Sequence, residues 1–439
     1  MFSFLYQKNK YYLNGIDWII SVLDLMTRKS IGLNNFSHVV IETQTLINKE
    51  ELTLLLNQNL KKFPFLNGYI KRNYNLAPYW KIPNKKNKNQ LNIKYIVSEN
   101  NDIHKIFNTI LNIPFKSREH YLSFFLIKEK DKNYFIMKFD HRIFDAYGAE
   151  QFLNIIKDFS LDKKYIFKNS SNLCKWKDKF FAGKTINRFF IKLLEGNKKS
   201  EISILLNPIK RKKIFSHIVS FNEKETEFII NKAYNKAGYL FIMPYLLAVT
   251  IKSLNNFLLK RKFKIPAYII PVNINMRDNK KEYNTMFFNH LSFLFFKFSN
   301  EDLLQDISFI IKQIKTQMYN QIEEKIPNKI LQATYLTRIV PLFLLNKIIN
   351  SILKNKKLNG FSFSYIESNI NNFFIEEKIN NIFHMPCVPT PPGLGIFFNK
   401  FQDKLNLTIS FVDSLILDKK EIKDFTNSIK DNLLKDIEK

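Results

Sequence analysis

The sequence has 439 residues, with 68 Lys and Arg against 39 Asp and Glu, which gives a net charge of +29. A chain of this length exceeds the size at which one hydrophobic core keeps growing, so we expect two domains. The positive charge favours anionic partners such as coenzyme phosphates, an acidic carrier protein or anionic lipid headgroups. Specific nucleic-acid binding is not expected, because no helix-turn-helix, zinc-finger or RNA-binding signature accompanies the charge.

The cysteine and histidine patterns exclude several classes of site. Cys174 and Cys387 are far apart and have no CxxC partner, which excludes a disulfide framework and fits a reducing compartment. The histidines show no metal-ligand spacing, so no metal site is expected. Residues 1–8 do not resemble a signal peptide. The best apolar segment, residues 239–251, is shorter than the roughly 20 residues of a bilayer span. We therefore expect a cytoplasmic protein, with association to a membrane surface left open.

In the first half of the chain, predicted strands and helices alternate. The residues 49–61 have the apolar spacing of a helix, and the turn Phe-Pro-Phe-Leu-Asn-Gly at 63–68 ends it. Apolar or alternating runs predict strands at 39–45, from residue 69, at 91–97, at 121–127 and at 134–139. Residues 160–210 are polar, basic and weakly periodic, which indicates a crossover between the halves.

The second half repeats the strand-helix alternation. Asn222 is predicted to cap a helix, since its side chain can accept from the free N–H groups of the first turn. A capped helix closes the chain, with Ile422, Phe425, Ile429 and Leu433 on one face. Strands are predicted at 215–221, 267–274, 291–298, 396–398 and 405–412. We expect domains at 1–165 and 213–439, with residues 166–212 as the linker between them.

The stretch Asp-His-Arg-Ile-Phe-Asp-Ala-Tyr-Gly at 140–148 is the most informative feature of the sequence. It follows the buried strand predicted at 134–139 and precedes a helix whose face includes Ala149 and Phe152. His141 thus lies where a strand ends, and α/β folds commonly bind ligands in crevices at strand ends. A histidine there can act as a base near neutral pH, because its ordinary pKa is about 6.5.

This stretch resembles the His-His-x-x-x-Asp-Gly motif of the chloramphenicol-acetyltransferase-like, CoA-dependent acyltransferases. That superfamily includes condensation domains, wax ester synthases and plant BAHD transferases. The turn at 63–68 is similar to the early x-Pro-x-Leu-x-Gly turn of these proteins. The helical segment 223–254 and the Pro-Val-Asn-Ile-Asn-Met-Arg stretch at 271–277 resemble features of their second domain, and Asn289 matches an asparagine frequent among them. The resemblance spans nearly the whole chain.

The resemblance implies an α/β (α+β) fold of two similar domains, each a mixed sheet packed with helices, with the active-site channel between them. It implies transfer of an acyl group from acyl-CoA or a carrier-bound phosphopantetheine thioester to a hydroxyl or amine, with no permanently bound cofactor. His141 would be the catalytic base, and Asp145 would form a structural ion pair with Arg277. The other residues expected near the channel are Asp140, Ala146, Tyr147, Gly148 and Asn289. A monomer is expected, acting on a small-molecule or lipid acceptor.

Several alternatives stay open at this point. Asp145 could instead be a plain N-cap of the following helix, and Arg142 is the second candidate for its partner. The sequence departs from the motif at Asp140, which stands for the first histidine, and at Ala146, which stands for the glycine. Ser364-Tyr365-Ile366-Glu367 stands where Ser-Asn-x-Gly is usual. A catalytically inactive member of the fold that binds a carrier or another partner is therefore the rival interpretation.

Overall fold

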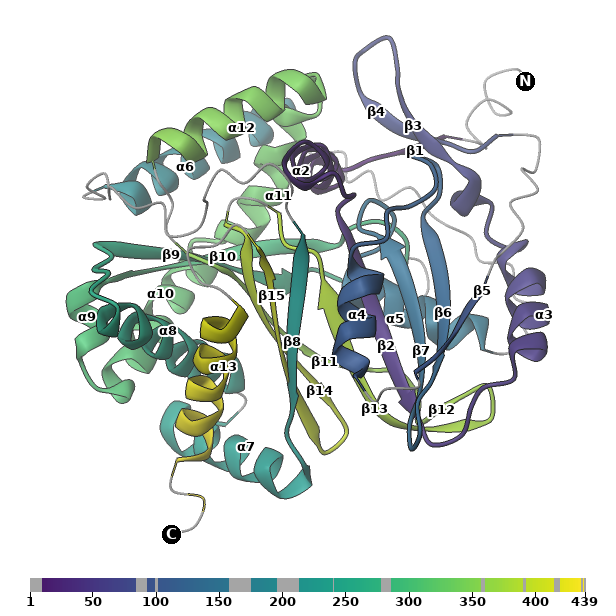
Figure 1. Ribbon diagram of the computed structural model, residues 1–439. Helices are drawn as coiled ribbons and strands as arrows, with labels where there is room; N and C mark the ends of the chain where they lie inside the picture. Colours follow the sequence, from purple (N-terminus) through teal and green to yellow (C-terminus); the bar gives the residue numbers. More distant parts are fainter. Residues whose placement is uncertain are drawn as a thin grey trace.

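The computed structural model describes residues 10–83, 93–98, 102–157, 175–195, 213–239, 241–277, 286–356, 360–389, 392–413, 419–435 and 437. Within these residues the chain forms two lobes, each built on a six-stranded mixed sheet, and a smaller three-stranded sheet. Figure 1 shows the two large sheets beside each other, with helices on their outer faces. This is the two-lobed mixed α/β architecture that the sequence predicts.

The first sheet has its most buried strands in the middle. Every residue of β2 (Phe36–Thr43) and β7 (Asn133–Asp140) is buried, because both faces of the sheet are covered, as a continuous apolar run predicts. The strand order is β12-β13-β2-β7-β6-β5, with β12 (Phe373–Phe374), β13 (Glu377–Pro386), β6 (Leu122–Lys128) and β5 (Ile93–Val97). The helices of this lobe are α3 (Lys49–Leu60), α4 (Ile103–Leu111) and α5 (Ala146–Ile156).

The second sheet carries the larger hydrophobic core. Its order is β10-β9-β11-β14-β15-β8, with β10 (Leu291–Ser299), β9 (Ala267–Asn275), β11 (Ser362–Glu367), β14 (Leu394–Phe401), β15 (Lys404–Val412) and β8 (Ile214–Ser220). The helices that pack on it are α7 (Glu223–Ala237), α8 (Ile242–Lys260), α9 (Asn300–Leu304), α10 (Ile307–Glu323) and α13 (Lys419–Leu434). Ile422, Phe425, Ile429 and Leu433 of α13 are all fully buried, which confirms the predicted apolar face.

A helical layer and the small sheet complete the molecule (Figure 1). The layer contains α2 (Gly15–Ile31), α6 (Trp176–Leu194), α11 (Ile326–Thr337) and α12 (Leu342–Lys356). The small sheet has the order β1-β4-β3, with β1 (Lys10–Tyr12), β4 (Pro78–Lys81) and β3 (Tyr69–Arg72), and the short helix η1 (Pro64–Asn67) precedes β3. Helix α11 contacts α2 and α6 within the layer and β10 of the second sheet, so the layer packs against the second lobe.

The domain boundaries stay a prediction, and two features of the fold bear on them. The expected linker contains α6, a helix of 19 residues that packs on α11. The second half of the chain also contributes β12 and β13 to the first sheet, where β12 is the edge strand and β13 lies between β12 and β2. Strand β13 pairs with β2 from Ile379 opposite Thr43 to Pro386 opposite Ser37. The apolar edge of β2 needs this partner, and no nearby segment of the chain supplies one.

The helical segment predicted after Asn222 is two helices. Asn222 caps α7 with a capping box to Glu225, and α7 ends at Gly238, whose φ of 98° suits a residue without a side chain. Helix α8 begins at Ile242 and is longer than the apolar segment identified at 239–251. Among the described residues α8 is the one helix long and apolar enough to cross a membrane, but 72% of its most apolar window is buried inside the protein. It is a core helix of the second lobe.

Candidate functional site

His141 is held at the end of β7 by its own backbone. Its N–H donates to the carbonyl of Asn35 at 2.9 Å, and the N–H groups of Ile143 and Phe144 donate back to Asp140. The chain therefore turns sharply between the strand and α5, and the His141 side chain is half-buried. A short parallel bridge between Phe144 and Phe288 ties this turn to the second half of the chain.

The side chain of Asn289 fixes the orientation of the His141 ring. Its Nδ2 lies 2.9 Å from the carbonyl oxygen of His141, which can only accept, so this atom of the amide is the donor. Its Oδ1 then faces Nδ1 of His141 at 3.2 Å. Since an amide oxygen only accepts, Nδ1 of the imidazole carries the proton. The neutral ring therefore keeps the lone pair of Nε2 for another proton.

Asp17, at the start of α2, positions Asn289 in turn. Its Oδ1 accepts from the backbone N–H of Asn289 at 2.9 Å and from Nδ2 at 3.3 Å. Asp17 also completes a capping box with Asn14, whose Nδ2 donates to the Asn289 carbonyl at 3.1 Å. Burial raises the pKa of Asp17 to about 7, against the opposing effect of these hydrogen bonds. The chain Asp17–Asn289–His141 thus joins three segments that are far apart in the sequence.

Asp145 combines both of its alternative structural roles. As the N-cap of α5 it accepts from the Gly148 N–H at 2.8 Å. Its two carboxylate oxygens also receive Nη1 and Nη2 of Arg277 at 2.9 and 2.7 Å, and the His290 N–H donates to it at 3.0 Å. Burial is the largest single influence and would raise the pKa of Asp145. The Arg277 guanidinium, together with His290 and the Gly148 N–H, nevertheless holds this pKa below its ordinary value. The bidentate pair that the resemblance implies is present.

Asp140 lies away from the imidazole of His141. It is fully buried and accepts from the backbone N–H, Nε and Nη2 of Arg142 at 2.7 to 2.9 Å. Arg142 also approaches Asp24 at 3.8 Å. Asp140 therefore belongs to a buried ionic cluster with Arg142 and Asp24, away from the His141 ring. It is expected near the channel from the sequence, but among the described residues no hydrogen bond links its side chain to the site around His141. Arg142, the second candidate partner of Asp145, is committed to this cluster.

The start of α5 accounts for the departure at Ala146. Ala146 is the first residue of the helix and does not have a positive φ, so the backbone there requires no glycine. The close contact occurs two residues later, because a Cβ on Gly148 would lie 2.1 Å from the carbonyl oxygen of Met286. The ring of Tyr147 lies 4.8 Å from the Arg277 guanidinium. Gly148 thus lets α5 approach the segment that carries Asn289.

Asp17 and Asn14 are the members of this site that sequence reasoning missed. The only local signal is an Asn-x-x-Asp capping pattern before an apolar helix, which marks a helix start and nothing more. Of the predicted residues, the structure brings His141, Asp145, Arg277, Tyr147, Gly148 and Asn289 together around residues 286–290. His290 is also here, with its Nε2 3.1 Å from the Phe287 carbonyl. Burial lowers the pKa of His290.

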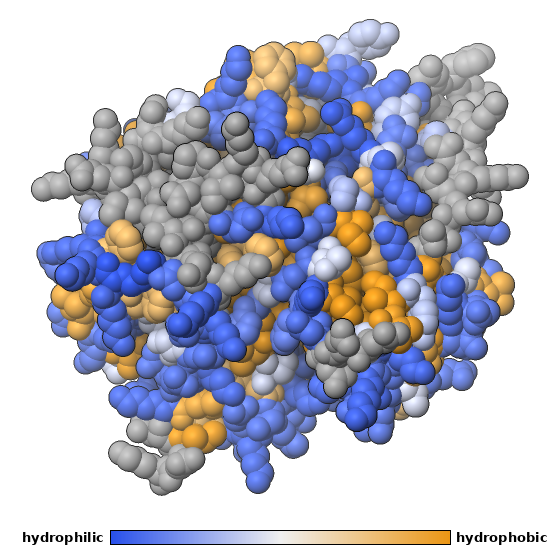
Figure 2. All heavy atoms as spheres, viewed as in Figure 1, coloured by the Kyte–Doolittle hydropathy of each residue, from blue (hydrophilic) through white to orange (hydrophobic). Residues whose placement is uncertain are grey.

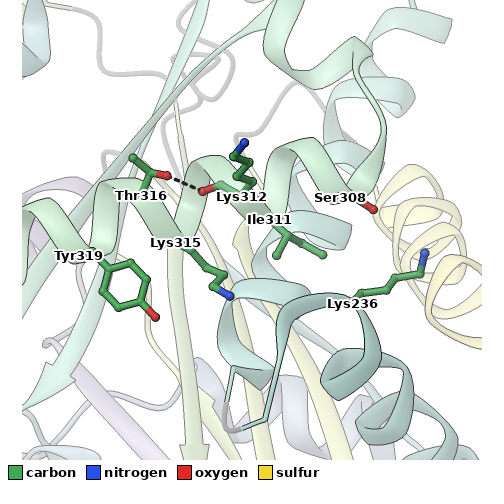
Figure 3. Close-up of a pocket in the computed structure, with 7 residues that line it drawn as sticks. All are labelled: Lys236, Ser308, Ile311, Lys312, Lys315, Thr316 and Tyr319. Atoms are coloured by element: carbon green, nitrogen blue, oxygen red, sulfur yellow. Dashed lines mark hydrogen bonds between the residues drawn. The ribbon is translucent and has the colours of Figure 1, made fainter.

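A cavity of about 260 Å³ lies elsewhere, between α7 and α10. Figure 3 shows Lys236 facing α10 across it. Lys315 donates from Nζ to the carbonyl of Ala237 at 2.8 Å, and so caps the end of α7. The other residues that line the cavity are Ser308, Ile311, Lys312, Thr316 and Tyr319. None of the lining residues is a histidine or a carboxylate. Among the described residues no group of three or more His, Cys, Asp and Glu could hold a metal ion.

The fold is that of condensation domains and related acyltransferases. The trichothecene 15-O-acetyltransferase from Fusarium sporotrichioides superposes with a TM-score of 0.69 at 13% identity, over 97% of this chain and 94% of the other. The starter condensation domain of rhizomide synthetase, in complex with C8-CoA and Leu-SNAC, gives 0.65 at 10% identity, over 98% and 94%. The wax ester synthase/diacylglycerol acyltransferase from Marinobacter aquaeolei gives 0.60 at 9% identity, over 98% and 100%.

Comparisons of sequence add nothing to this likeness. No protein-family model matches the chain, and no curated protein sequence matches it. The predicted fold class and the resemblance to the CoA-dependent acyltransferase and condensation-domain fold are confirmed by the structures alone.

Proposed function

We propose that the protein is an acyltransferase in which His141 is the general base. Nε2 of His141 takes the proton of an acceptor hydroxyl or amine as that group attacks the carbonyl carbon of a thioester. The new carbon–oxygen or carbon–nitrogen bond forms, the carbon–sulfur bond breaks, and the thiol leaves with a proton returned from the imidazolium. General base catalysis of this kind typically contributes roughly 10²–10⁴-fold.

The observation that carries the proposal is the hydrogen-bond chain on His141. Asn289 holds Nδ1 as the proton-bearing nitrogen at 3.2 Å and anchors the backbone of the same histidine at 2.9 Å. This leaves Nε2 as the basic nitrogen in a ring that cannot rotate without breaking the contact. When Nε2 takes up a proton, Nδ1 of the positively charged ring still donates to Oδ1 of Asn289. Asn289 is in turn held by its backbone N–H, which donates to Asp17.

The donor is proposed from the ligands of a protein with a similar fold. The structurally similar condensation domain of rhizomide synthetase was solved with C8-CoA and Leu-SNAC. We therefore propose acyl-CoA or a carrier-bound phosphopantetheine thioester as the donor here. The donor arrives as a co-substrate, and the acceptor is a small molecule or a lipid bearing a hydroxyl or an amine. The net charge of +29 suits the phosphates of either donor. We further propose that the protein is a monomer in the cytoplasm and that its active-site channel runs between the lobes.

The rival interpretation, an inactive carrier-binding protein, rested on the departures at residues 140 and 146. Asp140 does not face the imidazole of His141, and Ala146 occupies an ordinary helical position. Neither departure therefore removes a group from the immediate surroundings of Nε2.

The test is thiol release from a panel of acyl-CoAs of different chain lengths, each offered alcohol and amine acceptors. The proposal predicts thiol release that depends on the acceptor, with the acylated acceptor identified by mass. Tight binding of a CoA thioester or a loaded carrier protein, without acceptor-dependent release for any pair, would favour the inactive binder instead.

A further inference from the structure

Helix α6 exposes an unusual set of large apolar side chains. Trp176, Phe180, Phe181 and Ile191 are 56%, 62%, 66% and 53% exposed. The spacing of these positions places them on one side of the helix. The opposite side, with Ala182 and Ile186 buried, packs against α11. Single exposed apolar residues are normal on a soluble protein, whereas a row of them along one helix marks an interaction site.

Basic residues lie among these aromatic side chains. Lys184, Arg188 and Lys192 are exposed and follow the same side of α6 at intervals of four. The helix contains five basic residues and one acidic residue. We name the exposed side of α6, with its apolar and basic residues, the α6 face.

A second apolar surface begins beside the α6 face. At the corner where α11 gives way to α12, Ile339 and Phe343 are 43% and 60% exposed, and Ile348 further along α12 is 45% exposed. Tyr335 of α11 joins α6 to this corner. Its ring lies 5.3 Å from Nζ of Lys179 in α6 and 5.0 Å from the guanidinium of Arg338, just after α11. Figure 2 shows apolar atoms gathered at the surface over α12, at the top of the molecule.

The mixture of residues favours a lipid surface over a protein partner. The centres of protein–protein interfaces are depleted in charged residues, and Lys in particular is rare there. Helices that lie in the membrane interface carry Trp, Phe and Leu on an apolar face together with Lys and Arg on a polar face. A protruding helix face also suits a bilayer, which receives side chains between its headgroups. Each Lys or Arg near an anionic leaflet contributes about 1 kcal/mol.

We propose that the α6 face and the adjoining corner of α12 bind the surface of an anionic lipid bilayer. The aromatic side chains enter the headgroup region while Lys184, Arg188 and Lys192 pair with lipid phosphates. This binding does not depend on whether the protein transfers acyl groups.

The position of this surface relative to His141 gives the binding a use. Thr334 of α11 packs against Gly15 of α2 so closely that a Cβ on Gly15 would lie 2.2 Å from its Oγ1. Two residues further along α2, Asp17 begins the chain of hydrogen bonds to His141. If the proposed acyl transfer holds, α11 and α2 would separate a bilayer on the α6 face from the base, and the bilayer would supply a lipid-borne acceptor.

The test is co-sedimentation of the full chain with vesicles of phosphatidylcholine alone and of phosphatidylcholine mixed with phosphatidylglycerol. The protein should bind the anionic vesicles and release them as salt is raised, since the charge attraction is screened. The variant Lys184→Glu/Arg188→Glu/Lys192→Glu should lower the partition coefficient by roughly 100-fold or more, from about 1 kcal/mol for each residue. Phe180→Ser/Phe181→Ser should lower it by roughly tenfold or more at unchanged charge.

A matched control separates this surface from the charge of the whole molecule. Lys49→Glu/Lys105→Glu/Lys224→Glu changes the net charge by the same amount at exposed positions on other helices, and it should bind vesicles like the wild type. Tyr95→Ser removes an exposed aromatic residue on β5, the outer strand of the first sheet, and should also have no effect. Circular dichroism and thermal unfolding check that each variant is folded.

Three results would overturn the proposal. The first is an absence of binding to anionic vesicles. The second is an equal loss of binding in the two triple-charge variants, which would reduce the effect to net charge. The third is a wild-type dimer or carrier-protein complex that Phe180→Ser/Phe181→Ser dissociates without any change in vesicle binding, which would make the face a protein interface.

Discussion

Asn289 connects His141 to Asp17 across 148 and 272 residues of sequence. Two of its hydrogen bonds end on His141, one on the imidazole and one on the backbone carbonyl. The amide therefore selects the tautomer of the base and also fixes the strand end from which the base projects. No other described side chain makes hydrogen bonds to both the ring and the backbone of His141.

Asn289→Ala should lower kcat by roughly 10- to 100-fold, a part of the effect expected of the base itself, with little change in KM for the donor. The imidazole would lose its fixed tautomer while the donor site stays intact. Asn406→Ala is the matched control, because Asn406 is also fully buried and bonds across the seam between β13 and β15. Both variants should lose about 1–3 kcal/mol of stability, but only the first should lose turnover. Steady-state kinetics that leave kcat of Asn289→Ala at the wild-type value would contradict the assignment.

Asp17 makes stability depend on pH in a predictable direction. Its pKa is raised by burial from 3.8 to about 7, so the folded state holds a proton that the unfolded state has lost between these values. The contribution of Asp17 to stability is therefore greatest below pH 4 and declines as pH rises to about 7, by an amount on the order of a few kcal/mol. The charged groups around it are Asp145 and the Arg338 guanidinium.

Asp17→Asn removes this titration, so the fall in unfolding free energy between about pH 4 and pH 7 should be shallower than in the wild type. Denaturant unfolding at several pH values measures how steeply the unfolding free energy falls with pH. The substitution also weakens the hydrogen bond from the Asn14 N–H to residue 17, but that loss lowers stability at every pH and leaves the slope unchanged. An unchanged slope would show that Asp17 titrates near its ordinary pKa in the folded protein.

At the scale of elements, the predictable parts of the fold are those with strong local signals. The apolar run before Asp140 predicts β7, and Asn222 with Glu225 predicts the start of α7. Helix α6 was missed because several of its aromatic residues face outward, which blurs the apolar periodicity. The pairing of β13 with β2 spans 347 residues between His38 and Met385, and nothing local in either segment specifies it.

The candidate site divides in the same way. His141, Asp145 and Arg277 were reached through a motif, since their residue types and order are those of a known superfamily. Asp17 was not, because its role depends on the packing of α2 against residues 286–290 and not on its neighbours in the chain. The alternation of a strand predicts that Asp140 points away from His141, and in the structure Asp140 bonds to Arg142 instead.

The packing of α5 against residues 286–288 gives a test at this scale. Gly148→Ala places a methyl group 2.1 Å from the backbone oxygen of Met286, and backbone cannot give way as a side-chain tip can. The helix must shift, with a cost of about 3 kcal/mol or more. Gly183→Ala in α6 meets only Cδ1 of Leu336, at 3.0 Å, and gains helix propensity of up to about 1 kcal/mol. Thermal unfolding should lower Tm for the first variant and leave it unchanged or higher for the second. Equal Tm values would contradict the close packing of α5.

For the whole molecule, the contribution of β12 and β13 to the first sheet makes the first lobe depend on the second half of the chain. The first sheet receives these strands from the second half of the chain, and Asn381 of β13 exchanges hydrogen bonds with Asn406 of β15. The first lobe is therefore completed by strands from the second half of the chain. The candidate site also draws on both halves, with His141 from the first and Asn289 from the second.

A fragment of residues 1–212 should consequently fail to fold alone. Without β13 the fully buried strand β2 would present an unpaired apolar edge, which favours aggregation. The full chain should unfold in one transition, and co-expression with residues 213–439 should restore soluble 1–212. A soluble, monomeric fragment with the circular dichroism of a folded lobe would show that the lobes are independent.

The central claim, that His141 is the base of an acyl transfer, is tested most directly by single-turnover thiol release in wild type and His141→Ala with the same donor and acceptor. His104→Ala is the control, because His104 lies on the exposed side of α4. The account predicts that His141→Ala stays folded and slows acceptor-dependent release by roughly 10²–10⁴-fold, while His104→Ala reacts like the wild type. Wild-type rates in folded His141→Ala would contradict the account.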